Sequence, residues 1–168
     1  SAVDYEEAFP EADLEYLATE SLLKENIIVK RPGGSYVYDF LLETDGLSPV
    51  SLESGGIELR DGVGKAVFAI PPGYMEDAQG RSSGAVSYEL SPRGGDRFLL
   101  SVRAEASWMN AAERAFPVTI DPPVSIQGFY NIETGTLHES VPDGVGGQAA
   151  MESLGYYAAL GKSCRVLV

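Results

Sequence analysis

RAFPVTIDPP, at residues 114–123, is an apolar stretch that ends in a pair of prolines. Phe116, Val118 and Ile120 alternate with other residues, and this two-residue period is typical of a strand with one buried face. Because the two prolines have no N–H to donate to a neighbouring strand, we expect the sheet to end with them. The stretch therefore predicts the strand that closes a β domain.

Short strand patterns separated by turn residues fill the sequence before this stretch. Alternating or β-branched runs predict strands at residues 13–19, 24–30, 36–44, 50–53, 57–60, 65–70, 85–90 and 97–104. Glycine, proline and Asp-Gly pairs predict turns, three of which would close hairpins, at residues 32–35, 61–64 and 92–96. The acidic, loosely patterned residues 1–11 and the segment 71–81 are interpreted as irregular.

The segment 107–114, SWMNAAER, is the one helical turn that the sequence predicts, with Ser107 as its cap and Pro117 as its end. Trp108 in this turn is interpreted as a cover over one end of the core. No stretch has a long helical period. We therefore expect an all-β fold, a β-sandwich-like antiparallel domain with one short helical turn.

Two regions follow from these patterns. Residues 1–123 form the all-β domain, and residues 124–168 form a linker and the first strands of a second β module. In the second region, candidate strands at 154–160 and 164–168 flank a turn. Two alternatives are open for the last strand: the module is cut short there, or the strand adds to the sheet of the first domain.

Acidic residues outnumber basic residues by 25 to 12, which gives a formal net charge of -13 at pH 7. Such a field repels phosphate groups, so the composition predicts no nucleic-acid partner and argues against binding to an anionic membrane. No run of 18 apolar residues is present, so we expect no membrane insertion. The sequence begins at Ser1, and we expect a piece excised from a longer protein.

Catalytic motifs are not found in the sequence. His138 and Cys164 are the single residues of their types, which excludes a zinc site built from several such ligands. A Ser-His-Asp site would depend on His138, which lies in a loop rich in Gly, Ser and Thr, and a thiol–imidazole pair with Cys164 is the other arrangement considered. No pair of carboxylates is singled out for glycosidase chemistry. We therefore expect the chain not to be an enzyme.

Carboxylates on turns raise the alternative of a structural calcium ion. Asp77 and Asp143 are the candidate Ca²⁺ ligands, since secreted β-modules often bind this ion through oxygen atoms on turns. The competing interpretation is an ordinary turn, where aspartate caps the local backbone and glycine accepts a positive φ. No other cofactor is expected.

Aromatic residues in or beside loops raise the alternative of a carbohydrate-binding surface. Tyr130, Tyr156 and Tyr157 are the candidate contacts with a polysaccharide. The competing interpretation places them in the core, where the aromatic residues of a small β-domain are commonly found.

Several short blocks together resemble one region of large secreted or wall-associated bacterial proteins with YD (RHS-type) repeats. The blocks are DLEY at 13–16, KENII at 24–28, MEDA at 75–78, SW at 107–108 and the stretch 116–122. In those proteins the region precedes a β-sandwich module named for its DNRLRE motif and assigned to carbohydrate binding, and residues 155–168 are similar to the early strands of that module. The resemblance implies a multidomain parent that is secreted or located at the bacterial cell surface. It implies no catalytic residue.

These observations predict a non-catalytic structural or adhesive spacer domain whose partners are neighbouring domains of the same parent chain. The alternative is a carbohydrate-binding module that recognises a polysaccharide. A hydrolase fragment is the third class considered.

Overall fold

The computed structural model describes residues 2–18, 23–121, 152–157 and 162–167, and the side chains of residues 4–15 and 25–121. It consists of antiparallel strands and one short helix, α1 (Ala106–Met109), which confirms the predicted all-β fold. Among the described residues, no helix has the length and apolar character needed to cross a membrane.

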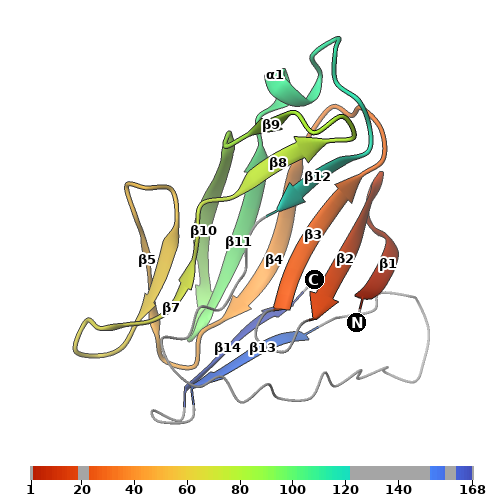
Figure 1. Cartoon of the computed structure of the whole chain (residues 1–168). Helices are drawn as coiled ribbons and strands as arrows, with labels where there is room; N and C mark the ends of the chain where they lie inside the picture. Colours follow the sequence, from red (N-terminus) through yellow and green to blue (C-terminus); the bar gives the residue numbers. More distant parts are fainter. Residues whose placement is uncertain (1, 19–22, 122–151, 158–161, 168) are drawn as a thin grey trace.

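The strands form three sheets (Figure 1). The first contains, in spatial order, β1 (Ala2–Phe9), β2 (Ala12–Ala18), β3 (Leu23–Val29), β12 (Val118–Asp121), β8 (Tyr74–Asp77) and β9 (Ser82–Ser83). The second contains β10 (Val86–Gly94), β11 (Arg97–Ala104), β4 (Val37–Glu43), β14 (Lys162–Leu167) and β13 (Glu152–Tyr157). The third contains β5 (Ser48–Ser51), β6 (Ile57–Arg60) and β7 (Ala66–Ile70).

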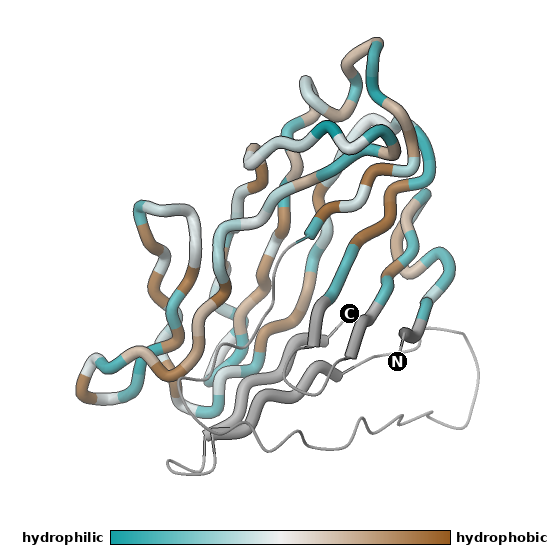
Figure 2. Tube along the Cα trace, viewed as in Figure 1, coloured by the Kyte–Doolittle hydropathy of each residue, from teal (hydrophilic) through white to brown (hydrophobic). Residues whose placement is uncertain are grey.

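One apolar core joins residues from all three sheets. Leu14, Ile27 and Ile120 come from the first sheet, Leu100 from the second and Leu59 from the third, and each of these side chains is at most 1% exposed. Burying one such side chain stabilises a fold by roughly 1.5–3 kcal/mol. Figure 2 shows apolar residues along the strands and hydrophilic residues in the connecting loops. The apolar residues that alternate along the strands therefore form the strand faces that are buried in the core.

The stretch 114–123 contains a strand, as its alternation predicted. This strand, β12, lies inside the first sheet, paired with β3 on one side and β8 on the other, which the sequence pattern did not predict. The pairing Ile120↔Ile27 and Ile120↔Met75 places three fully buried side chains in one row. The strand is apolar because it is central.

Three strands, β1, β8 and β9, were missed, and one predicted hairpin is wrong. β8 lies in the segment 71–81, whose prolines and glycines resemble a loop, yet its burial alternates as a half-buried strand does. β1 lies in the acidic N-terminal segment. The strands β3 and β4 do not pair with each other, because the connection between them crosses from the first sheet to the second.

The short helix also starts earlier than predicted. Glu105 is its N-cap, not Ser107, and the carboxylate of Glu105 accepts the N–H of Ser107 at 3.3 Å. The helix ends at Met109 because its C-cap, Asn110, leaves the helical conformation. Asn110 accepts a hydrogen bond from the hydroxyl of Tyr36 at 2.7 Å, which ties this end of the helix to the second sheet.

The strand β14 pairs with β4 through Arg165↔Glu43, Val166↔Leu42 and Leu167↔Leu41. The last predicted strand thus adds to a sheet of the first region in this structure. The boundary at residue 123 between two modules stays a prediction.

Candidate functional site: the Asp77 cluster

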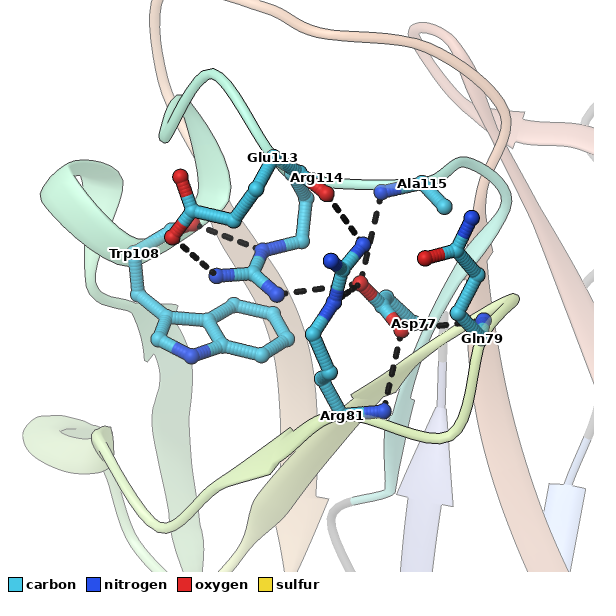
Figure 3. Close-up of polar contacts among 7 residues, drawn as sticks. All are labelled: Asp77, Gln79, Arg81, Trp108, Glu113, Arg114 and Ala115. Atoms are coloured by element: carbon cyan, nitrogen blue, oxygen red, sulfur yellow. Dashed lines mark hydrogen bonds and ion pairs between the residues drawn. The ribbon is translucent and has the colours of Figure 1, made fainter.

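The densest group of polar contacts in the described residues surrounds Asp77, at the end of β8. We call Asp77, Arg81, Trp108 and Arg114 the Asp77 cluster. The turn after β8 supplies Arg81, while α1 and the segment after it supply Trp108 and Arg114 (Figure 3). The cluster therefore joins two parts of the chain that are more than thirty residues apart.

The carboxylate of Asp77 accepts five hydrogen bonds. Its Oδ1 atom accepts the main-chain N–H groups of Gln79 and Arg81, each at 3.0 Å. Its Oδ2 atom accepts Arg81 Nε at 2.7 Å, Arg114 Nη1 at 3.0 Å and the main-chain N–H of Ala115 at 3.3 Å. The side chain is 0% exposed, so these donors replace the water that the carboxylate loses on burial.

Arg114 is the buried cation of the cluster, with 4% of its side chain exposed. Its Nε donates to the main-chain oxygen of Trp108 at 2.9 Å, and its Cζ lies 3.4 Å from the centre of the Trp108 ring. A guanidinium over an indole face gains a cation–π attraction that is larger away from water. Trp108 therefore holds Arg114 against Asp77 while also packing on the core.

Arg81 closes the cluster from the solvent side. Its side chain is 37% exposed, and its Nη2 donates to the main-chain oxygen of Glu113. A main-chain hydrogen bond joins the same two segments, because Ala78 donates its N–H to the main-chain oxygen of Ala115 at 3.0 Å. Side-chain and main-chain bonds thus hold the β8 turn against the segment 113–115.

Burial opposes the ionisation of Asp77, but hydrogen bonds from Arg81, Ala115 and Gln79 outweigh it and hold the pKa of the carboxyl well below its usual range. The carboxylate is therefore an anion at neutral pH and a poor proton acceptor. The cluster is thus a set of ion pairs between Asp77 and two arginines. These ion pairs connect the turn after β8 to the segment after α1.

A pocket of about 480 Å³ lies elsewhere, at the end of the β10–β11 hairpin. Its charged lining residues are Glu43, Asp45, Arg93, Asp96 and Arg97. Arg97 Nε lies 2.9 Å from Glu43 Oε1, so part of this charge is already neutralised. The lining has no His or Cys, and the described residues hold no group of three or more His, Cys, Asp or Glu side chains suited to a metal ion.

The predicted site residues are not brought together. Asp77 is in the cluster, and a calcium ion there would have to displace the guanidinium groups of Arg81 and Arg114. Asp143 and Tyr130 lie outside the described residues, as does His138. Calcium binding at Asp77 or Asp143 stays a prediction, and a shift of melting temperature between millimolar Ca²⁺ and EDTA tests it.

Tyr156 and Tyr157 lie in β13, whose main chain pairs with β14 through Tyr156↔Ser163 and Tyr157↔Lys162. Cys164 lies opposite Gly155 in the same hairpin. The side chains of this hairpin are outside the described part of the chain.

Comparison with known proteins shows that the chain is similar in sequence to WapA nucleases of Bacillus. The chain is 32% identical over 129 residues to the tRNA nuclease WapA of Bacillus subtilis, a match that covers 73% of this chain and 5% of that protein. It is 31% identical over the same length to the tRNA3(Ser)-specific nuclease WapA of Bacillus spizizenii, with the same coverage. The chain thus spans about 5% of the length of the curated relatives that it matches. No family model and no solved structure matches it.

These relatives correct several expectations from the sequence. They are named as WapA tRNA nucleases, so the predicted resemblance to the region before a DNRLRE-type carbohydrate-binding module is wrong. They are named as enzymes, which overturns the expectation of a non-catalytic spacer and leaves the carbohydrate-binding alternative without support. They are named for tRNA, which conflicts with the predicted absence of a nucleic-acid partner.

The error has a physical origin. The charge of -13 and the missing catalytic motif describe 168 residues, whereas the 129 matched residues are only 5% of the Bacillus subtilis protein. Repulsion between this acidic section and phosphate therefore says little about the surface that binds tRNA in a much longer protein. The short blocks that carried the resemblance are mostly strands and turns, such as the MEDA block in β8, and they encode structure more than activity.

Proposed function

We propose that the protein to which this chain belongs is a tRNA nuclease similar to WapA, and that this chain forms one all-β section of it. The observation that carries the proposal is the 32% identity over 129 residues to the Bacillus subtilis protein. A match that covers 73% of this chain is much longer than one short motif. The relatives differ in the tRNA for which they are named, so the substrate is stated here only as tRNA.

The experiment compares the purified full-length protein with Bacillus subtilis WapA as a positive control. Each is incubated with total bacterial tRNA, and the products are separated on denaturing gels. We expect the full-length protein to cleave a subset of tRNAs. Intact tRNA, under conditions in which the control cleaves its substrate, contradicts the proposal.

A second arm uses the 168-residue chain alone at the same molar concentration. Cleavage by this chain would locate the nuclease within it. Cleavage by the full-length protein only would locate the catalytic groups elsewhere in the protein and leave the proposal intact. Asp77→Asn in the full-length protein is the matched variant, and we expect it to lower the folded fraction without changing which tRNA is cut.

Location at the bacterial surface stays a prediction from the sequence. Fractionation of the producing cells, followed by immunoblotting of medium, wall and cytoplasm, tests it. Recovery in the cytoplasm alone would contradict it.

A further inference from the structure

A row of polar residues crosses the first sheet on the face opposite that of the core residues Ile27 and Ile120. Glu15 on β2 lies directly opposite Asn26 on β3. The register Ile120↔Ile27 places Asp121 of β12 on the other side of Asn26, one step further along both strands. Side chains directly opposite each other in antiparallel strands share a face, with Cβ atoms about 5 Å apart. Asn26 therefore lies between two carboxylates on neighbouring strands, which Figure 1 shows side by side.

The side-chain amide of Asn26 has a defined orientation. Its Nδ2 atom donates to Glu15 Oε2 at 2.7 Å. An ionised carboxylate only accepts hydrogen bonds, so the amide atom that faces Glu15 must be the nitrogen. The amide oxygen, Oδ1, is consequently turned away from β2, toward Asp121 on β12.

This oxygen of Asn26 is buried without a hydrogen bond. The residue is 5% exposed, and no donor in the described part of the chain reaches its Oδ1 atom. Burial of an amide oxygen without a donor is unfavourable, and nearly all buried polar atoms are satisfied by protein, by water or by an ion. The orphaned oxygen therefore indicates that a further group binds between β3 and β12.

The charge of the surrounding residues indicates what that group is. Asp121 is 3% exposed, Glu15 is half-buried, and Asp4 of β1 lies opposite Glu15 and extends the row. Among the ion pairs of the described residues, none involves Glu15. A water molecule would satisfy the amide oxygen but would leave the negative charge of the row uncompensated. A cation satisfies the oxygen and compensates the charge.

We propose that Glu15, Asn26 and Asp121 bind a calcium ion. Oxygen atoms of carboxylates and amides are the ligands that Ca²⁺ takes, and its flexible shell of about six to eight oxygens accepts water at the remaining positions. Asn26 Oδ1 and the carboxylate of Asp121 are the direct ligands, and Glu15 contributes its charge while it orients the amide. The site has two carboxylates and an amide, so it differs from the groups of three or more His, Cys, Asp or Glu that the described residues lack. The ion would connect β3 to the central strand β12.

The test measures the melting temperature of the 168-residue chain in EDTA and in millimolar CaCl₂, with NaCl at matched ionic strength as the salt control. We expect calcium to raise the melting temperature by about 4 °C or more. Asn26→Leu keeps the size of the side chain but removes its oxygen, and we expect this variant to show no rise. Asp13→Asn is the matched control, because Asp13 lies on the same face of β2 in the next row. We expect the full rise in Asp13→Asn.

Glu15→Gln is the second variant, and it decides the outcome if Asn26→Leu does not fold. Its side-chain oxygen can still accept the N–H of Asn26, but its charge is lost. We expect isothermal titration calorimetry with CaCl₂ to show about tenfold weaker binding to Glu15→Gln than to the natural chain. The proposal is overturned if calcium and matched NaCl have the same effect on the natural chain, or if Glu15→Gln binds calcium as tightly as the natural chain. An equal rise in Asn26→Leu also overturns it, because the ion would then bind elsewhere, as at Asp77 or Asp143.

Discussion

Asp77 is the residue whose carboxylate contacts both arginines of the cluster. Asp77→Asn keeps the size of the side chain but removes its charge, and its amide N–H₂ would face guanidinium donors. We expect the melting temperature at pH 7 to fall by roughly 10 °C, since a buried Arg114 would lose its partner. Circular dichroism measures the change, and the fluorescence of Trp108 reports on the cluster itself.

Asp61→Asn is the matched control for this variant. Asp61 also accepts two main-chain N–H groups, those of Val63 and Lys65, but it lies on an exposed hairpin turn. The side-chain oxygen of an asparagine at this position can accept the same two N–H groups. The substitution leaves no buried arginine without an opposite charge. We expect a change within about 2 °C. An equal fall in melting temperature for the two variants would show that the ion pairs of Asp77 add no stability beyond that of its turn.

Acid affects the same residue in a defined pH range. The folded-state pKa of Asp77 is depressed, so the stability that it contributes is fully present above the unfolded-state pKa, which is about 4, and is lost as the pH falls toward the folded-state value. We expect the free energy of unfolding to fall more steeply below pH 4 in the natural chain than in Asp77→Asn, which has no proton to gain there. Urea unfolding at pH 3, 4, 5 and 7 measures how the free energy of unfolding of each protein depends on pH. The same dependence in both proteins would contradict a depressed pKa of Asp77 in the folded state.

Gly73 sits where the chain before β8 presses against β10. A Cβ atom at this position would lie 2.8 Å from Val86 Cγ1 and 2.9 Å from the hydroxyl oxygen of Tyr88, which donates to the oxygen of Pro71 at 3.0 Å. We expect Gly73→Ala to lower the free energy of unfolding by about 1–3 kcal/mol. Gly84→Ala is the control, because nothing lies within 4 Å of its Cβ. Urea titration measures the free energy of unfolding of both variants. Equal losses in the two variants would contradict the close contact at Gly73.

At the scale of elements, strands with clear alternation between turns were predictable. The strand β6 and the hairpin β10–β11 lie close to their predicted bounds, since apolar periodicity and glycine turns agree there. β8 was missed because its two prolines and its glycine precede the strand by only a few residues. The pairing of β12 with β3 and β8 could not be predicted from the sequence, because it depends on which strands meet across long connections.

The central place of β12 predicts an asymmetry between its two faces. Ile120 is 0% exposed, whereas the neighbouring Thr119 is only partly buried. We expect Ile120→Ala to cost about 2–5 kcal/mol of unfolding free energy, because it leaves a cavity between sheets. Thr119→Ala, the control on the other face, should cost less than about 1 kcal/mol. Equal losses of unfolding free energy for the two variants in chemical denaturation would contradict this asymmetry.

The Asp77 cluster was only partly accessible from the sequence. Asp77 was singled out as a turn carboxylate, but Arg114 lies 37 residues away and has no pattern that links it to the turn. Trp108 was expected to cover the core, and it does pack there while its ring also holds Arg114. A buried charge needs an opposite charge close by, yet only the folded chain determines which arginine provides it.

At the scale of the whole molecule, the contact between β14 and β4 bears on the predicted boundary. A chain of residues 1–123 lacks β14 and so exposes the edge of β4 at Leu41–Glu43. We expect this shorter chain to melt below the 168-residue chain. Differential scanning calorimetry of both chains measures the difference. Identical melting temperatures would instead support two independent modules divided near residue 123.

The first sheet also constrains how the chain is made. β12, at residues 118–121, is the strand between β3 and β8, so the half that holds β1, β2 and β3 cannot join the half that holds β8 and β9 until residue 121 has left the ribosome. Until then both β3 and β8 expose an unpaired side to other nascent chains. Pairings this distant along the chain form slowly. During synthesis, the interval before residue 121 emerges is therefore when this section is most in need of a chaperone.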